Sequence, residues 1–117
     1  MNYNSNFSHD LEVGQVGEKA LGNILENSKI EVKTDFGTQS TGNVFVEYES
    51  RGRPSGIATS EADYWAFIIS QSQIIIIRTE TLKDIARGQF SNPSRLVLGG
   101  DNNTSKGVLI KVEELVQ

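Results

Sequence analysis

Two stretches of alternating residues decide the fold: KIEVKTD at residues 29–35 and NVFVEYES at residues 43–50. In both, apolar residues alternate with polar or charged ones, a period of two that is typical of a β-strand with two different faces. The segment between them, FGTQSTG, has the composition of a turn. The sequence therefore predicts two strands that pair, most simply, as an antiparallel hairpin.

The polar sides of these two strands carry most of the candidate chemistry. If the turn brings the ends of the strands together, Glu31 lies opposite Glu47 and Lys33 lies opposite Phe45. Any even shift of register keeps the same residues on the same face. One face of the hairpin is therefore predicted to hold Glu31, Lys33, Asp35 and Glu47.

The rest of the chain supplies helices and further strands. Apolar residues recur every three or four positions from residue 10 to about residue 26, which predicts a first helix. A Ser-x-x-Asp start signal at residues 60–63 predicts a second helix that ends near Ile69. We further expect a buried strand at residues 73–79, a helix at 81–87, strands at 95–98 and 108–112, and a last helical turn at 113–116.

Length and composition fit one domain of the α/β or α+β class. The chain has 117 residues, of which 37% are hydrophobic, enough for one small core. The predicted order α-β-β-α-β-α-β-β places a central mixed β-sheet between helices. Residues 1–9 are polar and aperiodic, so we expect a flexible N-terminal arm before a domain at residues 10–117.

Several classes of protein are excluded by what the chain lacks. It has no cysteine and a single histidine, His9, which excludes disulfides and thiolate nucleophiles and argues against zinc clusters and catalysis centred on a histidine. The N-terminus has no signal-peptide pattern, and no apolar run approaches about 20 residues. We therefore expect a soluble, cytoplasmic protein with no membrane partner.

The charged hairpin face has two interpretations. The formal net charge is −4, which argues against a large nonspecific polyanion-binding surface. A charged face on a hairpin is commonly solvated. The run QIIIIRT, however, predicts a strand buried on both sides, and such a strand needs a sheet covered on both faces. The charged face is then expected to be partly enclosed, where its groups need partners or a metal ion.

Residues 11–79 resemble the PD-(D/E)XK nuclease superfamily. The resemblance lies in a helix with an inward glutamate in VGEKAL, the acidic pair IEVKTD and NVFVEYE, and a following helix and apolar strand. The chain is similar in particular to small phage-type endonucleases and Holliday junction resolvase-like proteins, in which a K-x-D strand is followed by T-G-N and a glutamate. The matching residues here are Lys33-Thr-Asp35, Thr41-Gly-Asn43 and Glu47.

The resemblance implies a restriction-endonuclease-like fold that hydrolyses DNA phosphodiester bonds with Mg²⁺, for which Mn²⁺ can substitute. It also implies a phage-encoded protein acting in a bacterial host. The chain departs from the superfamily pattern at one place. Its E-x-K element, Glu31-Val-Lys33, lies on the earlier strand, whereas the later strand carries Glu47-Tyr-Glu49. Lys33 is therefore interpreted as a lysine that has migrated across the hairpin.

The resemblance and the residue types together assign roles. Asp35 and Glu47 are expected to be the main metal ligands, with Glu31 as a third carboxylate that completes the shell or holds a water. Lys33 is expected to position the attacking water and to stabilise negative charge. Glu18 is expected to join the site from the first helix, although a solvent-facing helix charge is equally consistent with its position.

DNA contacts are expected from four further residues: Arg51, Arg53, Lys19 and Ser55. A solvated loop is equally consistent with the two arginines, and a water-facing side chain is the alternative for Lys19. A chain this short covers little of a duplex, so we expect a homodimer that cuts two strands or a branched junction. The competing hypothesis is a catalytically inactive module of the nuclease fold that binds a basic protein through its acidic face. The low isoelectric point, about 4.9, and the absence of a lysine from the later strand favour this alternative.

Overall fold

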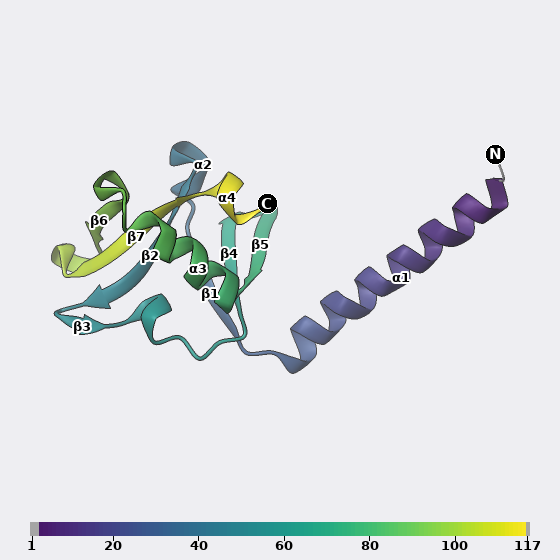
Figure 1. Cartoon of the computed structure of the whole chain (residues 1–117), viewed down its shortest axis with the longest axis horizontal. Coiled ribbons are helices and arrows are strands. Elements are labelled where there is room, and N and C mark those ends of the chain that lie inside the picture. Colours follow the sequence, from purple (N-terminus) through teal and green to yellow (C-terminus); the bar gives the residue numbers. More distant parts are fainter. Residues whose placement is uncertain (1–2, 117) are drawn as a thin grey trace.

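The structure, a computed structural model, describes the backbone of residues 3–116 and the side chains of residues 9–116. It is one small α+β domain from which the first helix projects (Figure 1). In chain order the elements are α1 (Tyr3–Asn27), β1 (Ile30–Thr34), α2 (Thr38–Thr41), β2 (Asn43–Ser50), β3 (Arg53–Pro54), a 3-10 turn (Gly56–Ala58), β4 (Tyr64–Ser70), β5 (Gln73–Arg78), α3 (Thr79–Gln89), a 3-10 turn (Pro93–Arg95), β6 (Leu96–Gly99), a 3-10 turn (Asp101–Asn103), β7 (Ser105–Lys111) and α4 (Val112–Leu115).

The strands form two sheets where the sequence predicts one central mixed sheet. One sheet has the order β1-β4-β5, with β1 parallel and β5 antiparallel to β4. The other is antiparallel, with the order β3-β2-β7-β6. The α+β class is confirmed, and the prediction of one sheet is wrong. Alternation within a strand shows which residues share a face, but it carries no information about which other strand lies alongside.

The core lies where the two sheets and α3 meet. Phe67 of β4, Val44 and Val46 of β2 and Leu82 of α3 are fully buried, and Trp65 is 1% exposed. Trp65 and Phe67 of the segment YWAFIIS are therefore core residues, as expected of large apolar side chains, whereas Tyr64 is half-buried outside the core. The alternation predicted for β2 is confirmed, because its buried valines are separated by partly exposed residues.

The predicted hairpin between residues 29–35 and 43–50 is not formed. Both stretches are strands, but β1 pairs with β4 in parallel and β2 pairs with β7 along almost its whole length. The turn FGTQSTG contains the short helix α2, which separates the two strands. Partners that are distant in the sequence provide longer ladders than the neighbouring strand, and a local pattern cannot reveal them.

The helix predicted at residues 60–69 is also wrong, because Tyr64–Ser70 forms strand β4. Both residues of the start signal have other partners. The Ser60 hydroxyl accepts a hydrogen bond from Trp65 Nε1 at 3.1 Å, and Asp63 Oδ2 accepts one from the Lys29 amide at 2.8 Å. The aromatic and β-branched residues that follow favour a strand, and their packing decides the outcome.

The remaining predicted elements differ from those in the structure mainly in how buried or how long they are. β5, α3, β6, β7 and α4 lie close to their predicted places. β5, however, is an edge strand, and Ile74 is 60% exposed, so the expectation of burial on both faces is wrong. The chain is helical from Tyr3, so the segment expected to be a flexible arm forms the first turns of α1, except for residues 1 and 2, which lie outside the described part.

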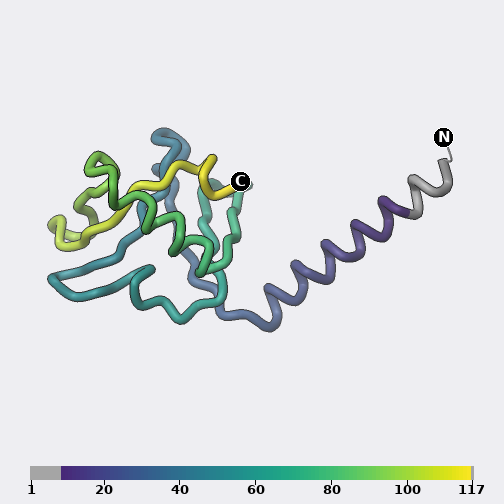
Figure 2. Tube along the Cα trace, in the orientation of Figure 1, coloured from purple at the N-terminus to yellow at the C-terminus, as the bar shows by residue number. Residues whose placement is uncertain are grey.

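Helix α1 leaves the domain and does not fold back onto it (Figure 2). Its 25 residues span about 37 Å and make up more than half of the longest dimension of the molecule, 60 Å. Among the described residues, no helix combines the length and the apolar character needed to cross a membrane.

Candidate active site

A polar cleft lies between β1 and β2. Its volume is about 460 Å³. β1 contributes Glu31 and Lys33, β2 contributes Glu47, and the remaining wall comes from Lys29 and from the segment between β3 and β4. Three of the predicted site residues therefore meet in one cleft, although the strands that carry them belong to different sheets.

The Glu47 carboxylate is held in place by the loop that follows β3. The Ser55 hydroxyl donates a hydrogen bond to Glu47 Oε2 at 2.9 Å, and the Ser55 amide donates to the Tyr48 carbonyl at 3.0 Å. The ladder between β2 and β7 shifts register between Glu47 and Glu49. Such bulges redirect a side chain out of the regular ladder and are common beside active sites.

Gly56 allows this loop to lie against β2. Its φ is +53°, a region that favours glycine. A Cβ atom at this position would lie 2.2 Å from the Glu47 carbonyl oxygen, closer than two such atoms can approach. The loop is therefore fitted to the backbone of Glu47, and a side chain at position 56 would displace it.

Asp35 is tied to β2 by its side chain. Its amide donates to the Ile68 carbonyl at 2.9 Å, while its Oδ2 accepts a hydrogen bond from the Phe45 amide at 3.2 Å. Phe45 and Glu47 are two residues apart on the same side of β2, about 7 Å along the strand. The Asp35 carboxylate thus lies beside the strand that carries Glu47.

Lys33 is an exposed cation on β1. Its Nζ lies 5.7 Å from the centroid of the Trp65 ring, a distance at which cation and ring attract each other. Among the described side chains, no carboxylate lies within ion-pair distance of this ammonium. The lysine is therefore positioned by an aromatic ring and keeps its hydrogen-bond donors available.

Other predicted residues lie away from the cleft. Glu18 and Lys19 are exposed on α1, and about 14 Å of helix separates Glu18 from Asn27 at the end of α1. Arg51 forms the tip of the tight β2–β3 turn, and Arg53 follows it, both exposed. The structure does not bring these four residues to the carboxylates.

Two further findings limit the number of carboxylates that can act together in the cleft. Glu49, which stands where the superfamily pattern has its lysine, pairs with Lys106 of β7 at 3.2 Å. Within residues 9–116, no three side chains of the types Asp, Glu, His and Cys converge as a ready metal-ligand set.

The cleft also contains residues that the sequence analysis did not single out. Ser60, Glu61 and Gly56 line it, and Thr59 lies beside them. In the sequence, the Ser55-Gly56 pair that follows the acidic strand is the feature that points to Gly56. The sequence predicts a helix start at Ser60 and Glu61, and such a local signal carries no information that these residues form the wall of a cleft.

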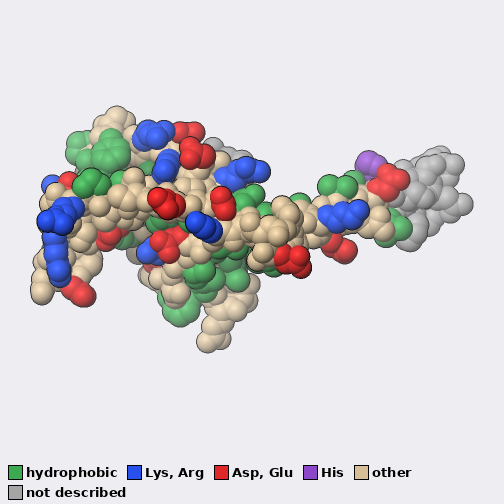
Figure 3. Space-filling model, turned by 90° about the horizontal axis from the view of Figure 1, so that it is seen from below, with side chains coloured by type: hydrophobic (Ala, Val, Ile, Leu, Met, Phe, Trp, Pro, Cys, Tyr) green, Lys and Arg blue, Asp and Glu red, His purple; other side chains and the backbone are tan. Residues whose placement is uncertain are grey.

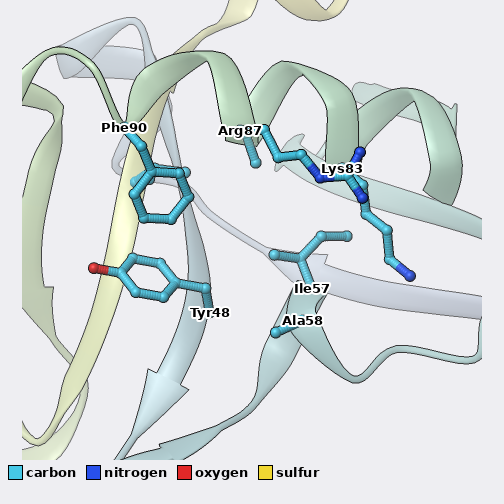
Figure 4. Close-up of a pocket in the computed structure, with 8 residues that line it drawn as sticks. Tyr48, Ile57, Ala58, Lys83, Arg87 and Phe90 are labelled. Carbon is cyan, nitrogen blue, oxygen red and sulfur yellow. The ribbon is translucent and has the colours of Figure 1, made fainter.

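A second cavity, of about 250 Å³, is apolar and lies under α3 (Figure 4). Tyr48 and Phe90 meet edge to face there, with ring centroids 4.9 Å apart. Lys83 and Arg87 are its charged lining residues, and Arg87 pairs with Asp84 at 2.8 Å. None of the described residues that line this cavity is a carboxylate, so the cleft between β1 and β2 is the better candidate for chemistry.

Comparison with known proteins adds no assignment. No protein-family model matches the chain, and no curated protein or solved structure matches it significantly.

Proposed function

We propose that this chain is a metal-dependent nuclease that hydrolyses DNA phosphodiester bonds, on a restriction-endonuclease-like variant of the PD-(D/E)XK fold. One observation carries the proposal: Glu31 and Lys33 of β1 and Glu47 of β2 meet in a single open cleft. Carboxylates beside an available ammonium are the residue types that this hydrolysis requires.

The donor set suits Mg²⁺. This ion takes oxygen ligands and is usually held by one or two carboxylates, with water and substrate phosphate completing its shell. Asp35 and Glu47 would be those carboxylates, and Glu31 would complete the shell or hold a water. When bound, Mg²⁺ neutralises charge on the phosphate and activates the attacking water, and Mn²⁺ is expected to substitute.

The residues of the chain supply positioning and charge. In the reaction a water oxygen bonds to phosphorus while one P–O ester bond breaks. The attacking water loses a proton to solvent, and the leaving sugar oxygen takes up a proton from solvent. Lys33 stabilises the negative charge that grows on the phosphate oxygens, and the Trp65 ring restricts its position beforehand. Ser55 has a matching function for Glu47, because its hydrogen bond fixes the carboxylate before substrate arrives.

The β2–β3 hairpin is the proposed DNA contact. Arg51 and Arg53 are exposed on it, and Ser55 connects it to the cleft. Arginines placed in this way contact phosphates on either side of a cut without reading sequence. Lys19 of α1 is a further proposed contact with the DNA backbone.

The test is cleavage of labelled DNA in Mg²⁺ and in Mn²⁺, with linear duplex, single-stranded, nicked and four-way-junction substrates. We expect the wild-type chain to cleave at least one of them and Glu47→Gln to cleave none. The matched control is Glu49→Gln, two residues along the same strand but paired with Lys106, which is expected to cleave normally.

Absence of cleavage by the wild-type chain, or normal cleavage by Glu47→Gln, would overturn the proposal. The inactive-module hypothesis then predicts a different result: binding of a basic protein that weakens when Glu31 and Glu47 are neutralised together.

A further inference from the structure

In the part of the chain that the structure describes, helix α1 has an apolar side that is open to solvent. Val13, Leu21 and Leu25 lie on this side and are between 48% and 59% exposed, whereas Leu11 and Val16, 53% and 68% exposed, lie at its two edges. Gly17 lies on the same side, four residues after Val13 and four before Leu21, and a Cβ atom there would meet nothing within 4 Å. An isolated helix of this composition is marginal in water, so its stability requires a covering surface.

The three-stranded sheet has an uncovered apolar face as well. One face of β4 and β5 points into the core, and the opposite face carries aliphatic residues from all three strands, namely Ile30, Val32, Ile68, Ile74 and Ile76. Val32 is 57% and Ile74 is 60% exposed, and none of the five packs against the core. Figure 3 shows hydrophobic side chains gathered on the part of the domain from which α1 leaves. We call this surface the outer face.

The chain exposes more surface than a compact monomer of its size. Its accessible area is 8089 Å², against about 6,300 Å² expected for 12.9 kDa. Its radius of gyration is 17.5 Å, against about 13 Å expected. The excess area, about 1,800 Å² per chain, is of the size that each subunit of a permanent homodimer buries.

The connection between α1 and β1 holds the helix away from its own sheet. The Lys29 amide donates to Asp63 Oδ2, and the Lys29 carbonyl accepts from the amides of Asp63 and Tyr64 at 2.8 and 3.2 Å. Only Ser28 lies between the end of the helix and this fixed residue. In the structure this short connection directs the helix away from its own domain (Figure 1).

The two uncovered surfaces are comparable in length. The apolar side of α1 from Val13 to Leu25 is about 18 Å long, and the seven residues of β4 span about 23 Å. We infer that two copies of this chain exchange α1, each helix laying its apolar side across the outer face of the partner. The inference goes beyond the proposed function, because it concerns the face of the sheet opposite the core.

The first experiment measures the mass of the full chain in solution by light scattering and sedimentation. We expect a dimer, and we expect Leu21→Asp to weaken association at least a hundredfold. The matched control is Gln15→Asp, the same new charge on the polar side of the helix, which should remain dimeric. A monomeric wild-type chain, or a Leu21→Asp chain that still dimerises normally, would overturn the inference.

The second experiment identifies the surfaces. The chain has no cysteine, so two single-cysteine chains of different tag length, Leu21→Cys and Ile74→Cys, can be co-expressed and treated with a short bis-maleimide. Exchange predicts a covalent product that contains both tags, whereas Gln15→Cys in place of Leu21→Cys should give little. In a single chain that carries both cysteines, crosslinking only within the chain would show that α1 folds back on its own domain, and the inference would fail.

Discussion

The two faces of the three-stranded sheet differ in what holds their side chains. On the core-facing side, Glu31 and Lys33 lie in the cleft, and the lysine ammonium lies over the Trp65 ring. On the outer face, Val32 and Ile74 are more than half exposed. Alternation along β1 places polar residues on one face and apolar residues on the other, because successive residues of one strand point to opposite faces.

The difference teaches that polar and apolar surfaces are completed in different ways. The cleft is assembled by directional hydrogen bonds within one chain, such as those from Ser55 to Glu47 and from the Phe45 amide to Asp35. The outer face has no directional partners, and burial by another apolar surface is the only contribution that would stabilise it. Substitutions in the cleft should therefore have effects that do not depend on protein concentration, because they act within one chain. The effects of substitutions on the outer face or on α1 should depend on protein concentration.

The largest expected effect is that of Gly56→Ala. The new Cβ would overlap the Glu47 carbonyl, and the alanine would also have to adopt a positive φ. We therefore expect the free energy of unfolding to fall by about 3 kcal/mol or more. Gly52→Ala is the control, because its φ is +79° but nothing lies within 4 Å, and it should cost only about 1–2 kcal/mol. Urea denaturation measures both. Equal losses would show that the loop is not fitted to Glu47.

The next largest effect is that of Lys33→Met on cleavage. The variant keeps most of the apolar stem and loses the charge, so turnover should fall about 10²-fold or more, as when a preorganised electrostatic group is removed. The midpoint of thermal unfolding and its increase with Mn²⁺ should be retained, because an ammonium near the metal only repels it.

Lys83→Met is the matched control, since Lys83 lines the apolar cavity instead of the cleft. Normal turnover by Lys33→Met would show that this lysine is only a structural partner of the Trp65 ring.

A smaller effect is expected for the double variant Arg51→Ala with Arg53→Ala. Each arginine that contacts a phosphate contributes about 0.9 to the slope of log affinity against log salt, so the slope should become shallower by about 1.8. Titrations of a labelled duplex at several salt concentrations measure it. The pair Lys83→Ala and Arg87→Ala removes the same charge elsewhere, and an identical change in slope there would exclude a specific role for the hairpin.

The smallest effects are expected for two glycines of α1. Gly22 lies on the polar side with Gln15 and Glu26, so Gly22→Ala should raise helix stability by about 1 kcal/mol and leave dimerisation unchanged. Gly17→Ala offers the same helical gain, but its methyl group lies on the side that the partner covers and should weaken association. Helicity from circular dichroism, measured across a dilution series, separates the two variants, and identical behaviour would contradict the placement of Gly17 in the interface.

Several elements could be predicted from the sequence because their signals are local. Alternation located β2 at Asn43–Ser50, and the apolar run located β5 at Gln73–Arg78. The acidic and basic residues of the cleft were found for the same reason, since alternation placed Glu31 and Lys33 on one side of a strand. Their meeting with Glu47 was expected from a hairpin that does not form. Three of the four grouped residues line the cleft through a different strand pairing, and Asp35 is not among its lining residues.

What the sequence determined by itself is therefore the position of most strands, the side of each on which a residue lies, and the amphipathic character of α1. These properties depend on backbone geometry within a few residues. The tertiary structure decided that Tyr64–Ser70 is a strand, that β1 pairs with β4 and that β2 pairs with β7. Those choices depend on packing between residues far apart in the chain, where the free energy of burying aromatic and β-branched side chains outweighs a local capping signal such as that of Ser60 and Asp63.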